Sequence, residues 1–128
     1  MQKEQKFFLC KHCGNLVGLV DNAGIPMSCC GEKMAELTPN TVDAAQEKHL
    51  PVVRVSGSEV SVEIGSVAHP MQSEHHIAWV YVQTEHGGQR KNLDVSAEPR
   101  VRFALTGGDR AAAVFAYCNL HGLWKADC

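Results

Sequence analysis

The sequence predicts a mainly β protein, in which a small metal-stapled N-terminal domain precedes an antiparallel β-sandwich. Three observations predict this fold class. Four of the six cysteines fall within the first 37 residues, where the chain is too short to bury an adequate core. From Pro51 onward apolar residues alternate with period two, and glycine-rich turns separate these runs. No apolar period of 3.6 residues has useful length, so long helices are not expected.

Composition narrows the functional classes. A chain of 128 residues with 45% hydrophobic content has room for one ordinary domain and a small second one. The net charge of −2 and the scattered basic residues, with no run longer than Arg90-Lys91, argue against a nucleic-acid partner. The polar N-terminus does not resemble a signal peptide, and no apolar run approaches the ~20 residues of a membrane helix. The expected location is the cytoplasm, where six cysteines indicate metal ligands more than disulfides.

The first domain is expected over residues 1–37. Cys10 and Cys13 form a C-x2-C knuckle, in which the following glycine permits a tight turn, and Cys29 and Cys30 supply a second, adjacent pair. Leu16–Val20 is expected to form a short strand, with a turn at Asp21–Gly24. Four thiolates close a tetrahedral shell, for which structural zinc is the usual occupant. Adjacent cysteines cannot repeat knuckle geometry, so a distorted site is expected.

The second domain is expected over residues 43–128, after a linker at Thr38-Pro39-Asn40. The stretch from Thr41 to Lys48 is compatible with a helical turn or an extended loop. Expected strands follow at short spacing, divided by turns at Gly57-Ser58, His86–Gly88 and Thr106–Asp109. They are two strands within residues 53–64, then Ile77–Val82, Arg100–Leu105 and Ala111–Tyr117.

A second metal site is indicated by histidines that lie in three separate short motifs. These motifs are Glu47-Lys48-His49, His69-Pro70-Met71-x3-His75, and Cys118-Asn119-Leu120-His121-Gly122-Leu123-Trp124-Lys125. Four histidines and one cysteine make five ligands, one more than a closed tetrahedral zinc site uses. An imidazole-rich five-ligand set suits iron, with one coordination position left for a substrate. His12, His76 and His86 are interpreted as ordinary surface histidines.

These motifs resemble the signatures of superoxide reductases. The C-x2-C and Cys-Cys pattern is similar to that of desulforedoxin, a module that carries one iron on four cysteines. Together the two parts resemble desulfoferrodoxin, the two-iron class of the superoxide reductase family. The resemblance implies an immunoglobulin-like sandwich for the second domain. It also implies reduction of superoxide to hydrogen peroxide without release of O2.

The resemblance also implies a role for each site residue and two iron ions per chain. Cys10, Cys13, Cys29 and Cys30 would bind the first iron. The second iron would have equatorial ligands and, opposite its open position, the axial thiolate of Cys118. Glu47 would fill that position in the ferric resting state, and Lys48 would be the cation beside it. The equatorial ligands would be His49, His69, His75 and His121.

The resemblance further implies a rubredoxin-like or other small electron donor and a homodimer. Cys128 matches no motif. Two alternatives stay open at the level of sequence. One is an electron carrier whose second site is not catalytic, which predicts the loss of some of the five ligands. The other is a zinc-stapled interaction module. A dismutase is disfavoured, because an attached one-electron relay suits net reduction.

Overall fold

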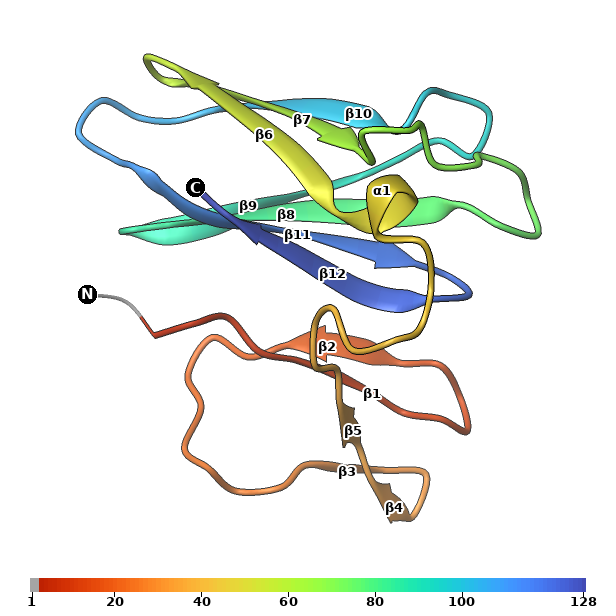
Figure 1. Cartoon of the computed structure of the whole chain (residues 1–128). Helices are drawn as coiled ribbons and strands as arrows, with labels where there is room; N and C mark the ends of the chain where they lie inside the picture. Colours follow the sequence, from red (N-terminus) through yellow and green to blue (C-terminus); the bar gives the residue numbers. More distant parts are fainter. Residues whose placement is uncertain (1–2) are drawn as a thin grey trace. The chain divides into compact units, whose positions relative to one another are not determined.

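The computed structural model describes residues 3–128, which divide into two compact units, Lys3–Thr38 and Pro39–Cys128 (Figure 1). The prediction of a mainly β fold with a small first unit is confirmed. Within the described residues the one helix is α1 (Gln46–His49). No helix in this part of the chain has the length and apolar character needed to cross a bilayer.

The first unit is built from two very small sheets. In the first sheet β1 (Phe7–Leu9) is central, flanked by β2 (Leu16–Gly18) and β5 (Ala35–Glu36). The second is a hairpin of β3 (Ser28–Cys29) and β4 (Glu32–Lys33). Phe7 and Cys10 are the buried apolar side chains described in this unit. So small a core cannot offset the entropy of ordering the chain, which agrees with the expected need for a metal.

The second unit is an antiparallel sandwich of two sheets, of three and four strands (Figure 1). This division matches that of a constant-type immunoglobulin domain. The order of the first sheet is β10-β7-β6 and that of the second is β12-β11-β8-β9. The strands are β6 (Pro51–Ser56), β7 (Glu59–Ile64), β8 (Ile77–Thr84), β9 (Gly87–Asn92), β10 (Arg100–Ala104), β11 (Ala111–Cys118) and β12 (Gly122–Asp127).

The core lies between these two sheets and follows from the period-two alternation. Val60, Val62 and Ile64 of β7 are buried, while the intervening residues of that strand point outward. The opposite sheet contributes residues such as Val80 and Val114, which are fully buried. At about 25 cal/mol per Å² of apolar surface removed from water, this interface supplies the main driving force for folding.

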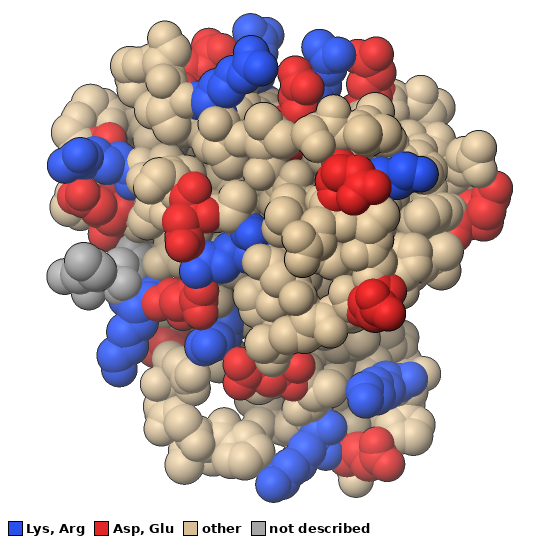
Figure 2. Space-filling view, in the orientation of Figure 1, with Lys and Arg blue, Asp and Glu red and all other residues tan. Residues whose placement is uncertain are grey.

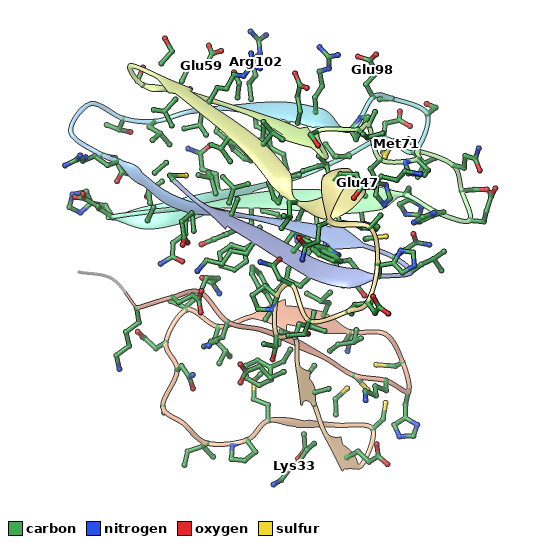
Figure 3. All side chains as sticks on the ribbon, viewed as in Figure 1. Lys33, Glu47, Glu59, Met71, Glu98 and Arg102 are labelled. Carbon is green, nitrogen blue, oxygen red and sulfur yellow. The ribbon has the colours of Figure 1, made fainter. Side chains whose placement is uncertain are left out.

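The outward face of β10-β7-β6 is covered by paired charges. Arg102 lies 3.7 Å from Glu59, and Arg100 lies 2.8 Å from Glu98. Figures 2 and 3 show basic and acidic side chains interspersed over this part of the second unit. Exposed pairs of this kind contribute little to stability, so they mark a solvated face.

The expected strands of the second domain correspond to β6, β7, β8, β10 and β11, and the stretch before Pro51 ends in the helical turn of α1. Six other strands, β1, β3, β4, β5, β9 and β12, were not predicted. β9 is largely polar, and β12 is a short segment that begins at Gly122, inside the Cys118 motif. β9 and β12 are strands because they pair with β8 and β11, so the sheet and not local propensity decides their conformation.

The sheet registers place three segments of the second unit at matching strand ends. Pro51, at the start of β6, pairs with Ile64, at the end of β7. In the other sheet Cys118, at the end of β11, pairs with Ile77 and with Gly122. The segments adjoining these ends are α1, the loop between β7 and β8, and the β11–β12 turn. They carry all the histidines of the three motifs.

Candidate metal centres

The first unit brings its four cysteines together. The sulfur ligand atoms of Cys10, Cys13, Cys29 and Cys30 all lie within 4.8 Å of one another. The Sγ atoms of Cys13 and Cys29 are 3.6 Å apart, and those of Cys29 and Cys30 are 3.9 Å apart. Thiolates about 2.3 Å from a tetrahedral metal lie roughly 3.8 Å from one another. The sulfur positions therefore fit one metal ion.

Backbone geometry explains how two different cysteine pairs reach the same point. In the knuckle, Gly14 has φ +84° and its N–H donates to the carbonyl of Cys10. In the adjacent pair, Cys30 itself has φ +53°, and Gly31 follows with φ +78°. A left-handed conformation is costly for a residue with a Cβ. The Cys29-Cys30 pair therefore reaches the cluster through a strained turn, and the distorted angles at the metal stay a prediction.

The pKa values of the clustered thiols indicate that the cluster needs a cation. Hydrogen bonding from the Cys13 backbone lowers the pKa of Cys10 to about 6. Hydrogen bonds with the side chains of Cys13, Cys10 and Cys29 raise the pKa of Cys30 to about 12. The four sulfurs cannot all ionise while no positive charge compensates them. A bound cation supplies that charge and converts the thiols to thiolate ligands.

The second site is assembled from the three segments at the matching strand ends. α1 carries His49, the loop between β7 and β8 carries His69 and His75, and the β11–β12 turn carries Cys118 and His121. The ligand atoms of His49, His75, Cys118 and His121 all lie within 4.8 Å of one another. The Nε2 atom of His69 is 3.2 Å from Nε2 of His49. The structure thus brings all five expected ligands to one place.

The four imidazoles form a closed ring in the order His49, His69, His75, His121. Neighbouring ring centroids are 4.6, 4.6, 5.1 and 4.9 Å apart, whereas His49 and His75, across the ring, are 6.3 Å apart. A longer diagonal is the property of a square, since all pairs in a tetrahedron are equidistant. The arrangement suits four equatorial ligands.

Distances between nitrogens agree with this geometry. Nε2 of His49 is 3.1 Å from Nδ1 of His121 and 3.2 Å from Nε2 of His69. Nitrogens bound at right angles, each about 2.1 Å from a metal, lie roughly 3.0 Å apart. The fully buried Cys118 places its Sγ 3.9 Å from Nδ1 of His121. Cys118 is therefore placed to serve as a fifth ligand.

Backbone carbonyls orient two of the rings. Nδ1 of His49 lies 2.7 Å from the carbonyl oxygen of Ala45, and Nδ1 of His69 lies 2.7 Å from that of Pro70. Each Nδ1–H then donates outward, which leaves Nε2 as a free lone pair directed inward. Nε2 of His75 is buried and has no hydrogen-bond partner among the described residues. A buried nitrogen of this kind is costly without a partner, and a metal ion at the ring would supply one.

Burial keeps three of the imidazoles neutral, which is the form that binds metal. Desolvation lowers the pKa of His69 to about 4 and also lowers the pKa values of His49 and His75. Desolvation raises the pKa of Cys118, so its thiol ionises only when a cation is near. Four imidazoles, one of which has an unpartnered Nε2, and one thiol fit a five-coordinate iron better than a tetrahedral zinc.

Glu47 and Lys48 lie on α1 beside His49, and both side chains are exposed (Figure 3 labels Glu47). The positive charge of Lys48 contributes to lowering the pKa values of His49 and His75, so its field reaches the site. The Glu47 carboxylate does not belong to the group of close ligand atoms.

The remaining histidines take no part in either cluster of ligand atoms. His12 is exposed and lies 2.9 Å from Glu32. Nδ1 of His76 is 3.0 Å from the carbonyl of Gln72. His86 lies in the exposed turn before β9. Cys128, whose thiol is exposed, also lies outside both clusters of ligand atoms.

One residue of the site, Trp124, had no role assigned from sequence. Its buried indole stacks on the imidazole of His49, and its Nε1–H donates to the carbonyl of His121 at 3.1 Å. The available signal was the aromatic residue three positions after His121 in the third motif. The spacing alone does not say which ring it contacts.

Comparison with known proteins identifies the family. The desulfoferrodoxin family profile matches residues 41–127. A desulfoferrodoxin homolog from Archaeoglobus fulgidus is 39% identical over 126 residues, covering 98% of this chain and 99% of its own. A superoxide reductase from Pyrococcus horikoshii is 36% identical over 110 residues, covering 72% of this chain and 95% of its own.

A solved structure shares the fold over nearly the whole chain. The superoxide reductase from Treponema pallidum superimposes with a TM-score of 0.83 at 46% identity, covering 98% of this chain and all of that one. The likeness extends over both units, including the segments that carry the four cysteines and the imidazole ring. The chain therefore belongs to the desulfoferrodoxin family of superoxide reductases.

Proposed function

We propose that the chain reduces superoxide to hydrogen peroxide, with one electron taken from an outside donor. The observation that carries this proposal is the square of four imidazoles with the buried thiol of Cys118 beside it. Such a donor set leaves a sixth position open on an iron ion. The likeness to the superoxide reductase from Pyrococcus horikoshii, which covers 72% of this chain, supports the same activity.

Two iron ions per chain are proposed as the cofactors. The second would be held by Cys118 and the four ring histidines, and the first by Cys10, Cys13, Cys29 and Cys30. When bound, the second iron supplies the electron and an open coordination position. An all-sulfur first site changes little in shape on oxidation, so it suits one-electron relay.

Residues around the ring would draw the substrate in. Four neutral imidazoles and one thiolate leave a ferrous site with a charge of roughly +1, by ligand counting. Superoxide is a small anion, and the exposed Lys48 extends the positive field toward solvent. Because the whole chain carries a net charge of −2, this attraction must be local. Lys48 would also hold water close to the site as a source of protons.

Glu47 would act after the reaction. We propose that its carboxylate occupies the open position until the site is reduced again. In the structure this carboxylate is exposed and stands outside the group of close ligand atoms. The role therefore requires rotation of the side chain toward the ring.

The division of labour follows the expected domains, 1–37 as the relay and 43–128 as the reductase. The match of the family profile to residues 41–127 supports this division. The superoxide reductase of Pyrococcus horikoshii matches 72% of this chain over 95% of its own length. A rubredoxin-like or other small electron donor, a homodimer and a cytoplasmic location stay predictions from the family resemblance. Size-exclusion chromatography with light scattering would test the homodimer.

The test combines metal content with the stoichiometry of the reaction. The purified chain should contain two iron atoms and absorb visible light, which zinc does not. Reduction consumes one superoxide, one electron and two protons for each peroxide formed, and releases no O2. Dismutation consumes two superoxide ions and releases one O2 with each peroxide. Mixing chemically reduced protein with superoxide should therefore yield peroxide without O2. A colourless zinc protein, or release of O2, would reject the proposal.

The electron-carrier alternative predicted that some of the five ligands would be missing. All five are present in the sequence, and the short distances between their ligand atoms support the reductase over this alternative. A protein that carried electrons but formed no peroxide would revive that alternative.

A further inference from the structure

Gly65, which follows β7, lies against the backbone of α1. It is buried, with φ +86°. A Cβ placed there would lie 2.7 Å from the carbonyl oxygen of Lys48 and 2.8 Å from that of Glu47, and would also overlap the carbonyl oxygen of Val67. Both the backbone conformation and the space therefore require glycine.

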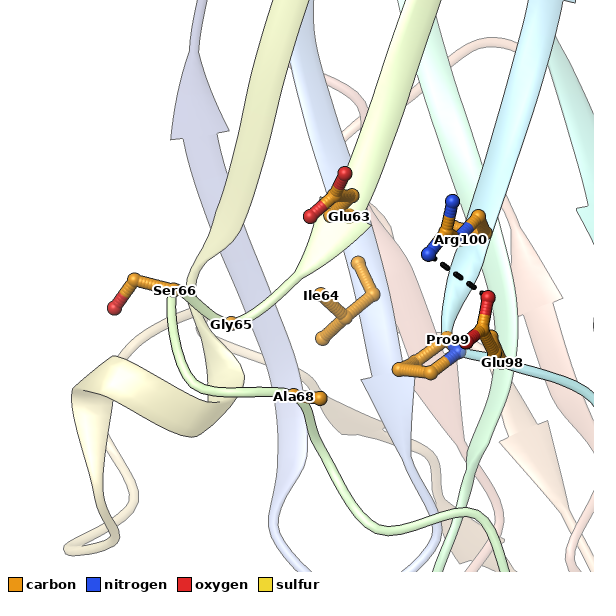
Figure 4. Close-up of a pocket in the computed structure, with 8 residues that line it drawn as sticks. All are labelled: Glu63, Ile64, Gly65, Ser66, Ala68, Glu98, Pro99 and Arg100. Atoms are coloured by element: carbon orange, nitrogen blue, oxygen red, sulfur yellow. Dashed lines mark ion pairs between the residues drawn. The ribbon is translucent and has the colours of Figure 1, made fainter.

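The turn that begins at Gly65 binds α1 and the residue that follows it, Leu50. The N–H of Gly65 donates to the carbonyl of Leu50 at 3.1 Å, and the N–H of Val67 donates to that of Glu47 at 2.9 Å. The hydroxyl of Ser66 donates to the same Glu47 carbonyl at 3.3 Å. Figure 4 shows Gly65 and Ser66 beside the ribbon of α1, at the rim of a cavity of about 160 Å³.

α1 depends on such support because it cannot hold itself. It has four residues, and Ala45 at its N-terminus provides no side-chain cap. An isolated helical turn of this length is unstable in water. Its position is instead set by hydrogen bonds to the neighbouring turn and by the burial of His49.

We infer that Gly65 and Ser66 are positioning residues that hold Glu47 and Lys48 beside the imidazole ring. This inference rests on the proposed function of that ring. Neither residue touches the site itself, and both act through the backbone of α1. Close contact by Gly65 lets the turn reach the Glu47 carbonyl, and Ser66 adds a second donor to it.

The test compares two glycine substitutions that share their backbone strain. Gly65→Ala introduces a Cβ into the contact with α1. Gly57→Ala is the matched control, because Gly57 also has a left-handed φ, +60°, but no atom lies within 4 Å of its Cβ position. Hydrogen–deuterium exchange of the iron-loaded protein should show amides of residues 45–50 and 65–67 exchanging about tenfold faster in Gly65→Ala only.

The same variants are compared in their reaction with superoxide. Gly65→Ala should slow the bimolecular step about fivefold and flatten its dependence on ionic strength, since Lys48 loses its fixed place. Iron content and the absorption of the four-cysteine site should not change. Ser66→Ala should also speed amide exchange and slow the reaction with superoxide, by less than Gly65→Ala does. Ser66→Thr, which keeps the hydroxyl, should match the unaltered protein in both measurements.

Equal exchange and equal salt dependence in Gly65→Ala and Gly57→Ala would overturn the inference. So would loss of second-site iron from Ser66→Ala, because the turn would then support His49 and not Glu47 and Lys48. Failure of the proposed function has a different signature, in which the unaltered protein forms no peroxide from superoxide. The exchange measurement gives its result in either case.

Discussion

The indole of Trp124 lies stacked on the imidazole of His49, with ring centroids 4.8 Å apart and an interplanar angle of 27°. The same side chain, which is 1% exposed, donates its Nε1–H to the carbonyl of His121. One buried residue thus orients two of the expected ligands. Residues of this kind tune metal affinity by fixing ligand geometry before the metal arrives.

Replacement of Trp124 by Phe should weaken iron binding at the second site. Phe keeps a ring against His49 but loses the hydrogen bond to His121, so affinity should fall about tenfold. Chelator competition, followed by the visible spectrum, measures this loss. Trp79→Phe is the control, because Trp79 stacks on Tyr117 and not on a histidine of the ring. Equal iron affinity in the Trp124 variant and the unaltered protein would show that the stack has no influence on the metal.

Cys13→Ser should separate the two sites. It removes one of four clustered sulfurs, so the absorption bands of the first iron should disappear. Peroxide production by chemically reduced protein should stay largely intact, since the imidazole ring does not include Cys13. Cys128→Ser, which alters an exposed thiol outside both clusters, should change neither. Loss of all reaction with superoxide in the Cys13 variant would contradict the division of labour.

Lys48→Ile should slow the encounter with superoxide. The exposed ammonium group supplies positive charge next to His49 and His75, so its removal should lower the bimolecular rate constant by several-fold to about tenfold. The rate should also lose part of its dependence on ionic strength. Pulse radiolysis at several salt concentrations checks both effects. Lys48→Arg retains the charge and should retain the salt dependence; an unchanged slope in Lys48→Ile would rule out steering.

Glu47→Ala should leave the first encounter nearly unchanged and alter the oxidised protein. A carboxylate prefers Fe(III), the harder and more charged ion, over Fe(II). The oxidised variant should therefore bind added azide more readily, and its thiolate-to-iron absorption band should shift. Glu59→Ala, which alters an exposed glutamate of β7, serves as the control (Figure 3). An identical spectrum and azide affinity in Glu47→Ala would show that the carboxylate never reaches the metal.

Asp109→Asn should destabilise the fold in a pH-dependent way. Hydrogen bonds from the Thr84 side chain and from the N–H groups of Arg110 and His86 hold the pKa of Asp109 below its ordinary value of 3.8. A depressed pKa means that the carboxylate stabilises the folded state above that value, and that this contribution is lost as the pH falls through the lower, folded pKa.

Urea unfolding measures the effect. The midpoint of the Asn variant should lie below that of the unaltered protein at pH 6, and the gap should close as the pH falls below 3.8. Asp21→Asn changes an exposed carboxylate of the first unit and should leave the urea midpoint unchanged at both pH values. A gap that is constant with pH would refute the linkage.

Local patterns in the sequence were enough to predict the candidate ligand residues and five strands of the sandwich, β6, β7, β8, β10 and β11. The C-x2-C and Cys-Cys pairs, the three histidine motifs and the alternation over β6, β7 and β8 all depend on spacings of a few residues. Over such distances the chain's own geometry decides which side chains meet. For the same reason the sequence assigned His12 and His86 to the surface, where the structure places them.

Tertiary structure alone decided the ring order, the stack of Trp124 on His49 and the fit of Gly65 against α1. His49 and His121, for instance, stand 72 positions apart, and their nitrogens meet at 3.1 Å. That distance depends on which strands pair and in what register. A shift of one residue in a sheet would turn every side chain of that strand to the opposite face, and the cost of exposing the core selects the register. Spacing along the sequence does not reveal the register, because the energy that fixes the register comes from packing of the whole sandwich.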